Sequence, residues 1–274
     1  MLFLSDLDFT LLRSDTSLSD FTKEVWNKAN KKAKLSIATA RSYTGVKELL
    51  KGLELKEPLI LLDGTIIAKP TGEILHMAAL ESELANTIIY GVKKELAVEP
   101  LIVAYKDNSE HFYYPKKLNK YQKELIKSME LRKRIFCEGE IRAKKKNLKI
   151  VYQANEQITK ALLSYLKKNF SDAIEVKSAL DPYYNCYFTT ILHKEGDKAH
   201  ALKKLEAIEN VSIAQTTVFG DSHNDLGLFS VAGVKIAVAN AIDELKEKAD
   251  IILPWSNDED AVAKYLQKKL LFGV

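Results

Sequence analysis

The sequence feature that most constrains the fold lies near the start of the chain, where an apolar run ends in two closely spaced carboxylates. Residues 2–4 form the run, and Asp6, Asp8 and Thr10 follow it at alternating positions. We interpret this as a buried strand whose tip, where the backbone turns into a loop, is suited to phosphoryl chemistry. The same short pattern occurs in loops in which Asp and Thr cap a helix. The interpretation therefore depends on the rest of the chain.

The composition is typical of a soluble globular protein that is long enough for two cores. The chain has 274 residues, of which 46% are hydrophobic and 28% are charged. The apolar run at its start is too short for a signal peptide, and runs such as 59–62 are far below membrane-spanning length. We therefore expect a cytoplasmic protein with no membrane partner.

The two cysteines do not indicate a disulfide framework or a zinc site. Cys137 and Cys186 are far apart in the sequence and lack the spacing of metal ligands. A free cysteine behaves as a small, frequently buried hydrophobic residue. We predict that both belong to the core.

The positive charge of the chain is unevenly distributed. The formal net charge is +4, and the stretch 116–149 is dense in Lys and Arg. One interpretation is a solvated helical face, and the other is a basic surface that steers anionic substrates. Nucleic-acid binding is disfavoured because Phe112, Tyr113 and Tyr114 precede the basic stretch rather than interleave with it. We predict no nucleic-acid partner.

Short apolar runs alternate with amphipathic stretches in both terminal parts of the chain. This alternation favours a parallel sheet covered by helices. Ser19 is the expected N-cap of the first helix. The predicted strands cover 2–4, 35–38, 58–62, 216–219, 234–238 and 250–253, and the predicted helices cover 19–31, 43–51, 197–208 and 258–270.

The middle of the chain does not show this regular alternation of strands and helices. A hairpin is predicted over 101–114, with its turn at 106–109. Few of the later strands have the flanking segments that parallel βαβ units require. Further strands are predicted over 148–153, 173–177 and 185–191, with a helix over 156–169. We therefore predict an α/β fold in which residues 1–81 and 190–274 form one core domain and residues 82–189 form an inserted α+β module.

Asp6 and Asp8 together carry the chemistry expected of a phosphoryl-transfer site. An ionised carboxylate can attack phosphorus and form an aspartyl phosphate, which divides hydrolysis into two easier steps. A neighbouring carboxyl group can protonate the leaving oxygen and later take a proton from water. We assign Asp6 to the attack and Asp8 to the acid and base steps.

Two further segments place polar groups at predicted helix starts. Thr39 follows a predicted strand, so its hydroxyl either cradles a phosphoryl oxygen or simply caps a helix. Lys198 opens a predicted helix, where the helix dipole repels a cation. An anionic group nearby would explain this lysine, which would then neutralise charge on the phosphoryl group.

The segment 218–225 completes the set of candidate residues. An apolar strand ends there in Gly220 and Asp221, and Asp225 follows at the next predicted helix start. Carboxylate oxygens from different strand ends suit Mg²⁺. We predict that Asp221 binds Mg²⁺ directly together with Asp6, while Asp225 and Asn224 hold metal-bound waters or the loop.

With these segments in hand, the chain resembles the haloacid dehalogenase superfamily of phosphohydrolases, in particular its Cof-like branch with a large inserted α/β cap. The resemblance rests on the ordered set Asp6-x-Asp8-x-Thr10, Thr39, Lys198 and Gly220-Asp221-Ser222-x-Asn224-Asp225. It implies a Rossmann-like core, aspartyl-phosphate catalysis, and Mg²⁺ held by Asp6, the backbone carbonyl of Asp8, and Asp221. It also implies that Thr10, Arg41, Gly64 and Asn224 contribute to substrate binding.

The chain departs from the pattern of that branch in two short segments near these residues. Ala40 stands where the branch usually has Gly, and Asp63-Gly64-Thr65 stands where it usually has Asn-Gly-Ala. Neither change removes a catalytic group. Asp63 would place an additional negative charge near the site entrance if its loop faces the phosphate.

The resemblance favours a Mg²⁺-dependent phosphomonoester hydrolase that acts on a small phosphorylated metabolite, most of all a sugar phosphate. A phosphomutase would use the same aspartyl phosphate but return the phosphoryl group to its substrate. A third possibility is a silent protein that binds phosphorylated metabolites, although four costly charges argue against a decayed site. We expect a monomer or a homodimer.

Overall fold

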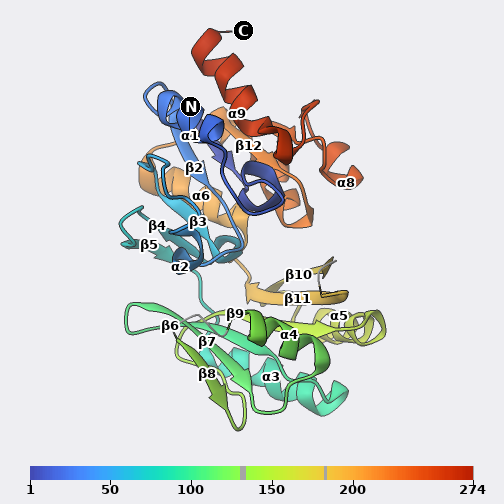
Figure 1. Ribbon diagram of the computed structural model, residues 1–274. Helices are drawn as coiled ribbons and strands as arrows, with labels where there is room; N and C mark the ends of the chain where they lie inside the picture. Colours follow the sequence, from blue (N-terminus) through green and yellow to red (C-terminus); the bar gives the residue numbers. More distant parts are fainter. Residues whose placement is uncertain (130–133, 182–183, 274) are drawn as a thin grey trace. The chain divides into compact units, whose positions relative to one another are not determined.

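The computed structural model describes residues 1–129, 134–181 and 184–273. The chain forms two compact units, one from Met1–Met77 with Asp197–Val274 and one from Ala78–Gly196 (Figure 1). The predicted junctions at 81/82 and 189/190 both lie inside the second unit. The reason is local pairing, because Leu80 forms a bridge with Asn147 and strand β11 (Cys186–His193) runs through residue 190.

The first unit contains a parallel sheet with the strand order β14-β13-β12-β1-β2. The strands β1, β2 and β12 are buried over most of their length, which favours apolar runs rather than alternation. The carboxyl ends of parallel strands meet at one edge of a sheet, so the residues that follow these strands are brought together there. The strands are β1 (Leu2–Ser5), β2 (Lys34–Ile37), β12 (Thr216–Gly220), β13 (Val234–Ala237) and β14 (Ile251–Ile252).

A smaller antiparallel sheet continues the first unit beyond β2. Ala38, just after β2, forms a parallel bridge with Ile60 in the next strand. The strands of this sheet are β3 (Leu59–Leu61), β4 (Ile66–Ala68) and β5 (Ile74–Met77).

The helices of the first unit begin close to the predicted positions but several end early. The Ser19 hydroxyl accepts a hydrogen bond from Thr22 N, which confirms the predicted N-cap. The predicted helix over 43–51 is wrong beyond residue 46, because the chain breaks into turns there. The helices are α1 (Asp20–Ala29), α2 (Tyr43–Val46), α6 (Lys198–Glu209), α7 (Leu226–Val231), α8 (Asp243–Lys246) and α9 (Ala261–Leu266), with a π-helical turn over Gln267–Phe272.

The second unit is built on a six-stranded sheet with the order β10-β11-β9-β6-β7-β8. Asp107 and Asn108 form the tip of the predicted hairpin, and both have positive φ (48° and 56°), as a tight two-residue hairpin turn requires. The other strands are β6 (Leu101–Lys106), β7 (Ser109–Pro115), β8 (Ile135–Glu138), β9 (Asn147–Ala154) and β10 (Ile174–Asp181).

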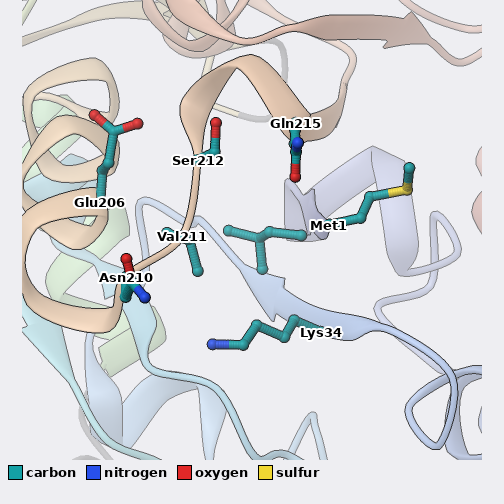
Figure 2. A pocket seen from close by; sticks show the side chains of 8 residues that line it. Met1, Lys34, Glu206, Asn210, Val211, Ser212 and Gln215 are labelled. Carbon is teal, nitrogen blue, oxygen red and sulfur yellow. The ribbon is translucent and has the colours of Figure 1, made fainter.

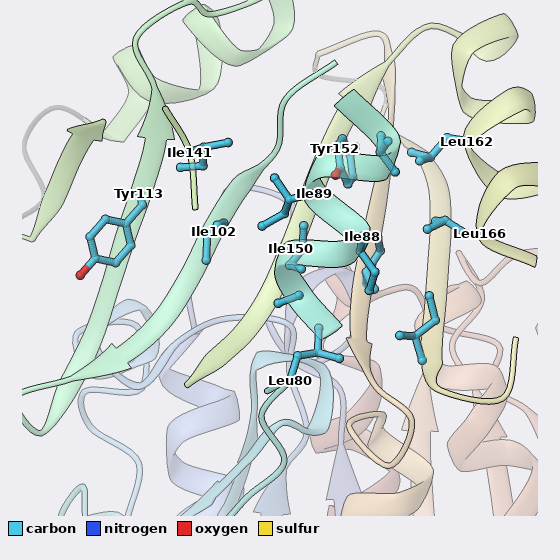
Figure 3. Close-up of a cluster of buried hydrophobic side chains, with 14 of the residues drawn as sticks. Leu80, Ile88, Ile89, Ile102, Tyr113, Ile141, Ile150, Tyr152, Leu162 and Leu166 are labelled. Atoms are coloured by element: carbon cyan, nitrogen blue, oxygen red, sulfur yellow. The ribbon is translucent and has the colours of Figure 1, made fainter. Parts of the chain in front are cut away.

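The core of the second unit forms between its sheet and two of its helices. Ile88 and Ile89 of α3 (Ser82–Leu96) pack over the strand residues Ile102 and Ile150, and Leu162 and Leu166 come from α5 (Glu156–Phe170) (Figure 3). α3 was not predicted, although its buried residues recur at helical spacing. α4 (Lys120–Met129) lies within the basic stretch 116–149, for which a solvated helical face was one interpretation. Among the described residues, no helix is long and apolar enough to cross a membrane.

The two cysteines lie in different environments. Cys186 on β11 is buried, as predicted, and burial raises the pKa of its thiol to about 11. Cys137 is exposed, so its assignment to the core is wrong. The physical reason is that Cys137 lies on β8, which is an edge strand of the sheet.

Candidate active site

Asp6 lies where β1 ends and the backbone turns. Its N–H donates to Phe219 O of the neighbouring strand β12 at 2.9 Å, so the parallel ladder fixes the carboxylate at the sheet edge. The following residues 7–11 form a π-helical turn that is interrupted at Asp8, which is extended, and at Phe9, which has φ 57°. Asp6 is 4% exposed. A carboxylate this deeply buried requires a charged or hydrogen-bonding partner.

Lys198 is that partner. It is the first residue of α6 and is 1% exposed. Its Nζ lies 2.6 Å from Asp6 Oδ1 and 2.6 Å from Asp225 Oδ1. The two carboxylates explain a cation at the positive end of a helix dipole, as the sequence predicted. Burial alone would lower the pKa of Lys198, but the charges of Asp225 and Asp6 outweigh it and the pKa is raised.

Asp225 and Asp221 come from the loop that follows β12. Asp225 Oδ2 accepts hydrogen bonds from the N–H groups of Asp221 and Ser222, at 3.1 and 3.3 Å. Gly220 permits this turn, since a Cβ on it would lie 2.7 Å from Asp225 Cβ and Oδ2. Thr10 Oγ1 donates to Asp221 Oδ1 at 3.0 Å, which ties the loop after β1 to the loop after β12.

Asp6, Asp221 and Asp225 form a buried acidic cluster. One carboxylate oxygen from each lies within 4.8 Å of the other two. Burial, followed by the charge of Asp225, raises the pKa of Asp221 to about 7. Burial also raises the pKa of Asp6, despite the opposing effect of Lys198. Three carboxylates around one ammonium leave an excess of negative charge.

The donor set of this cluster fits a divalent cation that prefers hard oxygen ligands, such as Mg²⁺. Both oxygens of Asp225 already accept hydrogen bonds from Lys198 and from two backbone N–H groups. This arrangement favours Asp6 and Asp221 as direct ligands and Asp225 as a supporting residue. The predicted roles of Asp225 and of the Asp8 backbone carbonyl stay predictions.

The Asp8 carboxylate does not join the acidic cluster but pairs with Arg41. Arg41 Nε lies 2.8 Å from Asp8 Oδ2, and Arg41 Nη2 lies 2.6 Å from Asp8 Oδ1. This is the two-pronged geometry that strengthens arginine–carboxylate pairs. The hydrogen bonds to Asp8, together with the charges of Asp8 and Asp6, raise the pKa of Arg41. The pair therefore lies within electrostatic reach of the cluster.

The remaining predicted site residues occupy the loops around these groups. Thr39 follows β2 and is fully buried, and its Oγ1 accepts from Arg41 N at 3.1 Å. The N-cap of α2 is Ser42, so the alternative in which Thr39 caps a helix is wrong, and Thr39 instead makes a hydrogen bond within its own loop. Asn224 Oδ1 accepts from Ser222 Oγ at 2.9 Å. Gly64 has φ 118° and lies against the backbone of Asp197 and Lys198 rather than against the acidic cluster.

A separate cavity of about 330 Å³ lies at the other end of the strands. It is lined by Lys34 at the start of β2 and by Met1 and Gln215, which precede β1 and β12 (Figure 2). The residues that lead into parallel strands lie at the sheet edge opposite to those that follow them. This cavity is therefore distinct from the acidic cluster.

The structure brings together Asp6, Lys198, Asp221 and Asp225, which the sequence singled out, but two contacts around them were not predicted. The sequence did not show that Asp225 contacts Lys198 directly, and it gave no sign that Gly64 packs on the start of α6. The turn signal of Asp63-Gly64 pointed to a loop. It contained no information about which segment the loop would meet.

Comparison with known families agrees with this geometry. A family model described as haloacid dehalogenase-like hydrolase matches residues 3–266. The chain therefore belongs to this family, and the motif-based resemblance is confirmed.

Individual relatives match the chain over almost its whole length, and one of them is named as a phosphatase. The 5-amino-6-(5-phospho-D-ribitylamino)uracil phosphatase YwtE of Bacillus subtilis is 28% identical over an alignment of 285 positions, gaps included, that covers 97% of this chain and 96% of the relative. The solved structure of TM0651 from Thermotoga maritima has a TM-score of 0.78 and 25% identity, and covers 97% of this chain and 96% of its own. The protein is thus a phosphatase that acts on phosphorylated substrates.

The predicted fold class is also confirmed. The solved structure of the haloacid dehalogenase subclass IIB sugar phosphatase BT4131 has a TM-score of 0.77, covering 99% of this chain and 98% of its own. At 19% identity this likeness supports the fold alone. It agrees with a parallel-sheet core that carries a second unit built on its own sheet.

Proposed function

We propose that the protein is a Mg²⁺-dependent phosphomonoester hydrolase that acts on small phosphorylated metabolites, above all sugar phosphates, through a phosphoryl group carried on Asp6. The observation that supports this proposal most strongly is the buried Lys198 ammonium, which lies 2.6 Å from both Asp6 and Asp225. Burying these charges is costly, and their positions suit the stabilisation of a phosphoryl group.

In the first step, an oxygen of Asp6 attacks phosphorus and forms an acyl phosphate, while the bond between phosphorus and the leaving oxygen breaks. Asp8, once Arg41 has released it and it holds a proton, gives that proton to the leaving oxygen, so a neutral alcohol departs. In the second step, Asp8 takes a proton from water, whose oxygen attacks phosphorus. The bond to Asp6 breaks and inorganic phosphate is released.

Lys198 and the acidic cluster prepare Asp6 for this attack. Lys198 Nζ fixes one oxygen of Asp6 by a charge-assisted hydrogen bond, which orients the carboxylate. Thr10 holds Asp221 in place from the neighbouring loop. Asp6 and Asp221 would hold Mg²⁺, which when bound supplies positive charge that neutralises the phosphoryl oxygens.

Arg41 and Asp8 are proposed to act together. Arg41 holds the Asp8 carboxylate through both of its oxygens. A guanidinium group in this position also has the charge and donor geometry to bind a phosphate oxygen. We therefore keep the predicted role of Arg41 in substrate binding, together with Thr10 and Asn224.

The name of the relative YwtE supports a sugar-like substrate. It describes a phosphate ester that carries a ribityl chain. A ribityl phosphate is a phosphorylated polyhydroxy compound. The same class of substrate is proposed for this chain.

The proposal is tested by phosphate release from a panel of sugar phosphates, nucleotides, pyridoxal phosphate and phosphoglycerates. We expect turnover with Mg²⁺, its loss with EDTA, and its return when Mg²⁺ is added. Asp6→Asn should lower kcat by about 10⁴-fold or more, whereas Asp20→Asn, at a fully exposed carboxylate, should leave it unchanged.

Two results would overturn the proposal. Turnover that persists in EDTA would remove the metal from the mechanism. Conversion of a hexose 1-phosphate to its isomer with little release of phosphate would identify a phosphomutase instead.

A further inference from the structure

The segment Leu62–Gly64 has an unusual backbone. All three residues have positive φ, with values of 51°, 64° and 118°. Asp tolerates this region and Gly prefers it, but Leu adopts it rarely. Strained backbone of this kind persists only where the surroundings hold it firmly. We refer to these three residues as the 62–64 turn.

The 62–64 turn is held on one side by the loop that follows β2. Leu62 N donates to Arg41 O at 3.0 Å, and Asp63 N donates to Thr39 O at 3.0 Å. The turn is closed by Thr65, whose Oγ1 donates to Leu62 O at 3.1 Å. Its position is therefore tied to the backbone of two proposed site residues.

On the other side, the 62–64 turn meets the start of α6. A Cβ on Gly64 would lie 2.2 Å from the carbonyl carbon and oxygen of Asp197 and 2.7 Å from Lys198 N. Backbone atoms this close cannot move aside as a flexible side chain can. Gly64 is therefore required here both by its φ and by the approach of α6.

We infer that the 62–64 turn is a positioning element that sets Lys198 relative to the Thr39–Arg41 loop, with Gly64 acting as a positioning residue rather than as a ligand of the substrate. This inference rests on the proposed role of Lys198 at the phosphoryl group. The turn joins two segments that are separated by more than a hundred residues in the sequence. A shift of α6 by a fraction of an ångström would move Lys198 Nζ away from Asp6.

The test compares Gly64→Ala with Gly52→Ala. Gly52 also has positive φ, at 99°, but a Cβ on it would meet the flexible Lys23 side chain at 3.1 Å and not α6. Both variants therefore add backbone strain, and only the first displaces Lys198. We measure kcat and KM with one phosphomonoester well below the melting temperature, together with Tm and a crystal structure of each variant.

For Gly64→Ala we expect kcat to fall by about tenfold to a hundredfold with little change in KM, because a small misplacement of a catalytic group has an effect of this size. The crystal structure should show Lys198 Nζ beyond hydrogen-bonding distance of Asp6 Oδ1, which it now approaches to 2.6 Å. Gly52→Ala should lower Tm while kcat and the Lys198 position stay unchanged.

A second variant covers the case in which Gly64→Ala does not fold. Thr65→Val removes the hydroxyl hydrogen bond to Leu62 O without adding bulk and leaves only the backbone bond from Thr65 N at 3.3 Å. It should lower kcat several-fold with KM unchanged. Equal loss of kcat in Gly52→Ala, or an unmoved Lys198 in every variant that folds, would overturn the inference. If the wild-type protein releases no phosphate, the proposed function fails, but the Lys198 position still decides the inference.

Discussion

The carboxyl edge of the sheet in the first unit and the cluster between the sheet and the helices of the second unit bury different kinds of side chain. At the carboxyl edge of the sheet in the first unit, Asp6, Asp225 and Lys198 are almost completely buried. In the second unit, the cluster packed between the sheet and α3 and α5 is made of aliphatic and aromatic side chains such as Ile88, Ile150 and Leu162. The first arrangement buries charged groups, whereas the second removes apolar surface from water.

From this difference we infer which part of the structure stabilises the fold and which part carries out the chemistry. Apolar burial contributes about 25 cal/mol per Å² and has no need of a particular partner. Buried charges contribute little or nothing to stability overall, even when they are well paired. The charged edge of the first sheet is therefore best explained by catalysis, and the apolar cluster by folding.

Of the variants considered, Lys198→Met is expected to change stability and kcat most. Removal of the ammonium leaves Asp6 and Asp225 buried without their cation, which costs about 3–5 kcal/mol of stability. Loss of charge stabilisation should also lower kcat by about 10²–10³-fold. Both are measured by denaturant unfolding and by phosphate release. A variant as active as the wild type would break the link between buried charge and catalysis.

Ile150→Ala tests the apolar cluster of the second unit. Ile150 is fully buried on β9 in the second unit, so its truncation should cost about 2–5 kcal/mol through lost burial and the cavity that remains. We expect kcat toward a small phosphomonoester to stay unchanged at a temperature where the variant is folded. A large loss of kcat in the folded variant would show that the two units are not separate in function.

The pH dependence of stability should be visible in the metal-free protein. The pKa of Asp221 is raised from 3.8 to about 7, so the folded protein holds a proton that the unfolded chain releases. Stability from this group is therefore present at low pH and is lost as the pH rises from about 4 to about 7, with a slope of up to about 1.4 kcal/mol per pH unit.

Asp221→Asn provides the control for this pH effect, because an amide does not ionise. Denaturant unfolding in EDTA across the same pH range should give a flatter profile for the variant than for the wild type. Identical profiles would show that Asp221 is not the group responsible.

The smallest effect on activity is expected from chemical labelling of the two cysteines of the second unit. Cys137 is exposed and Cys186 is buried with a raised pKa, and the thiolate is the reactive form. A thiol reagent should therefore label Cys137 in the native protein without loss of activity, and Cys186 only after unfolding. Rapid labelling of Cys186 in the native state would show that its part of the sheet opens.

Much of the first unit could be predicted from the sequence because its signals are local. The buried parallel strands are short apolar runs, and three of them lead into a polar group, Asp6, Thr39 or Asp221. Lys198 was identified because its charge opposes the helix dipole. These features depend on residues that are close in the sequence, so they can be predicted without the structure.

The remaining features depend on contacts between distant segments. Leu62 carries no local signal for its positive φ, which is held by Arg41 and by the packing of Gly64 on α6. The predicted end of the inserted module at residue 189 differs from the observed unit because β11 continues to His193 and pairs with β9 and β10. Strand pairing of this kind is not encoded in any single stretch of residues.

The measurement that tests the account most directly is trapping of the phosphorylated enzyme. The wild-type protein is mixed with a labelled phosphomonoester and Mg²⁺, quenched in acid during turnover, and digested for mass spectrometry. We predict a phosphoryl group on the peptide that contains Asp6, and no label in Asp6→Asn. Label on a different residue, or phosphate release by Asp6→Asn at the wild-type rate, would contradict the account.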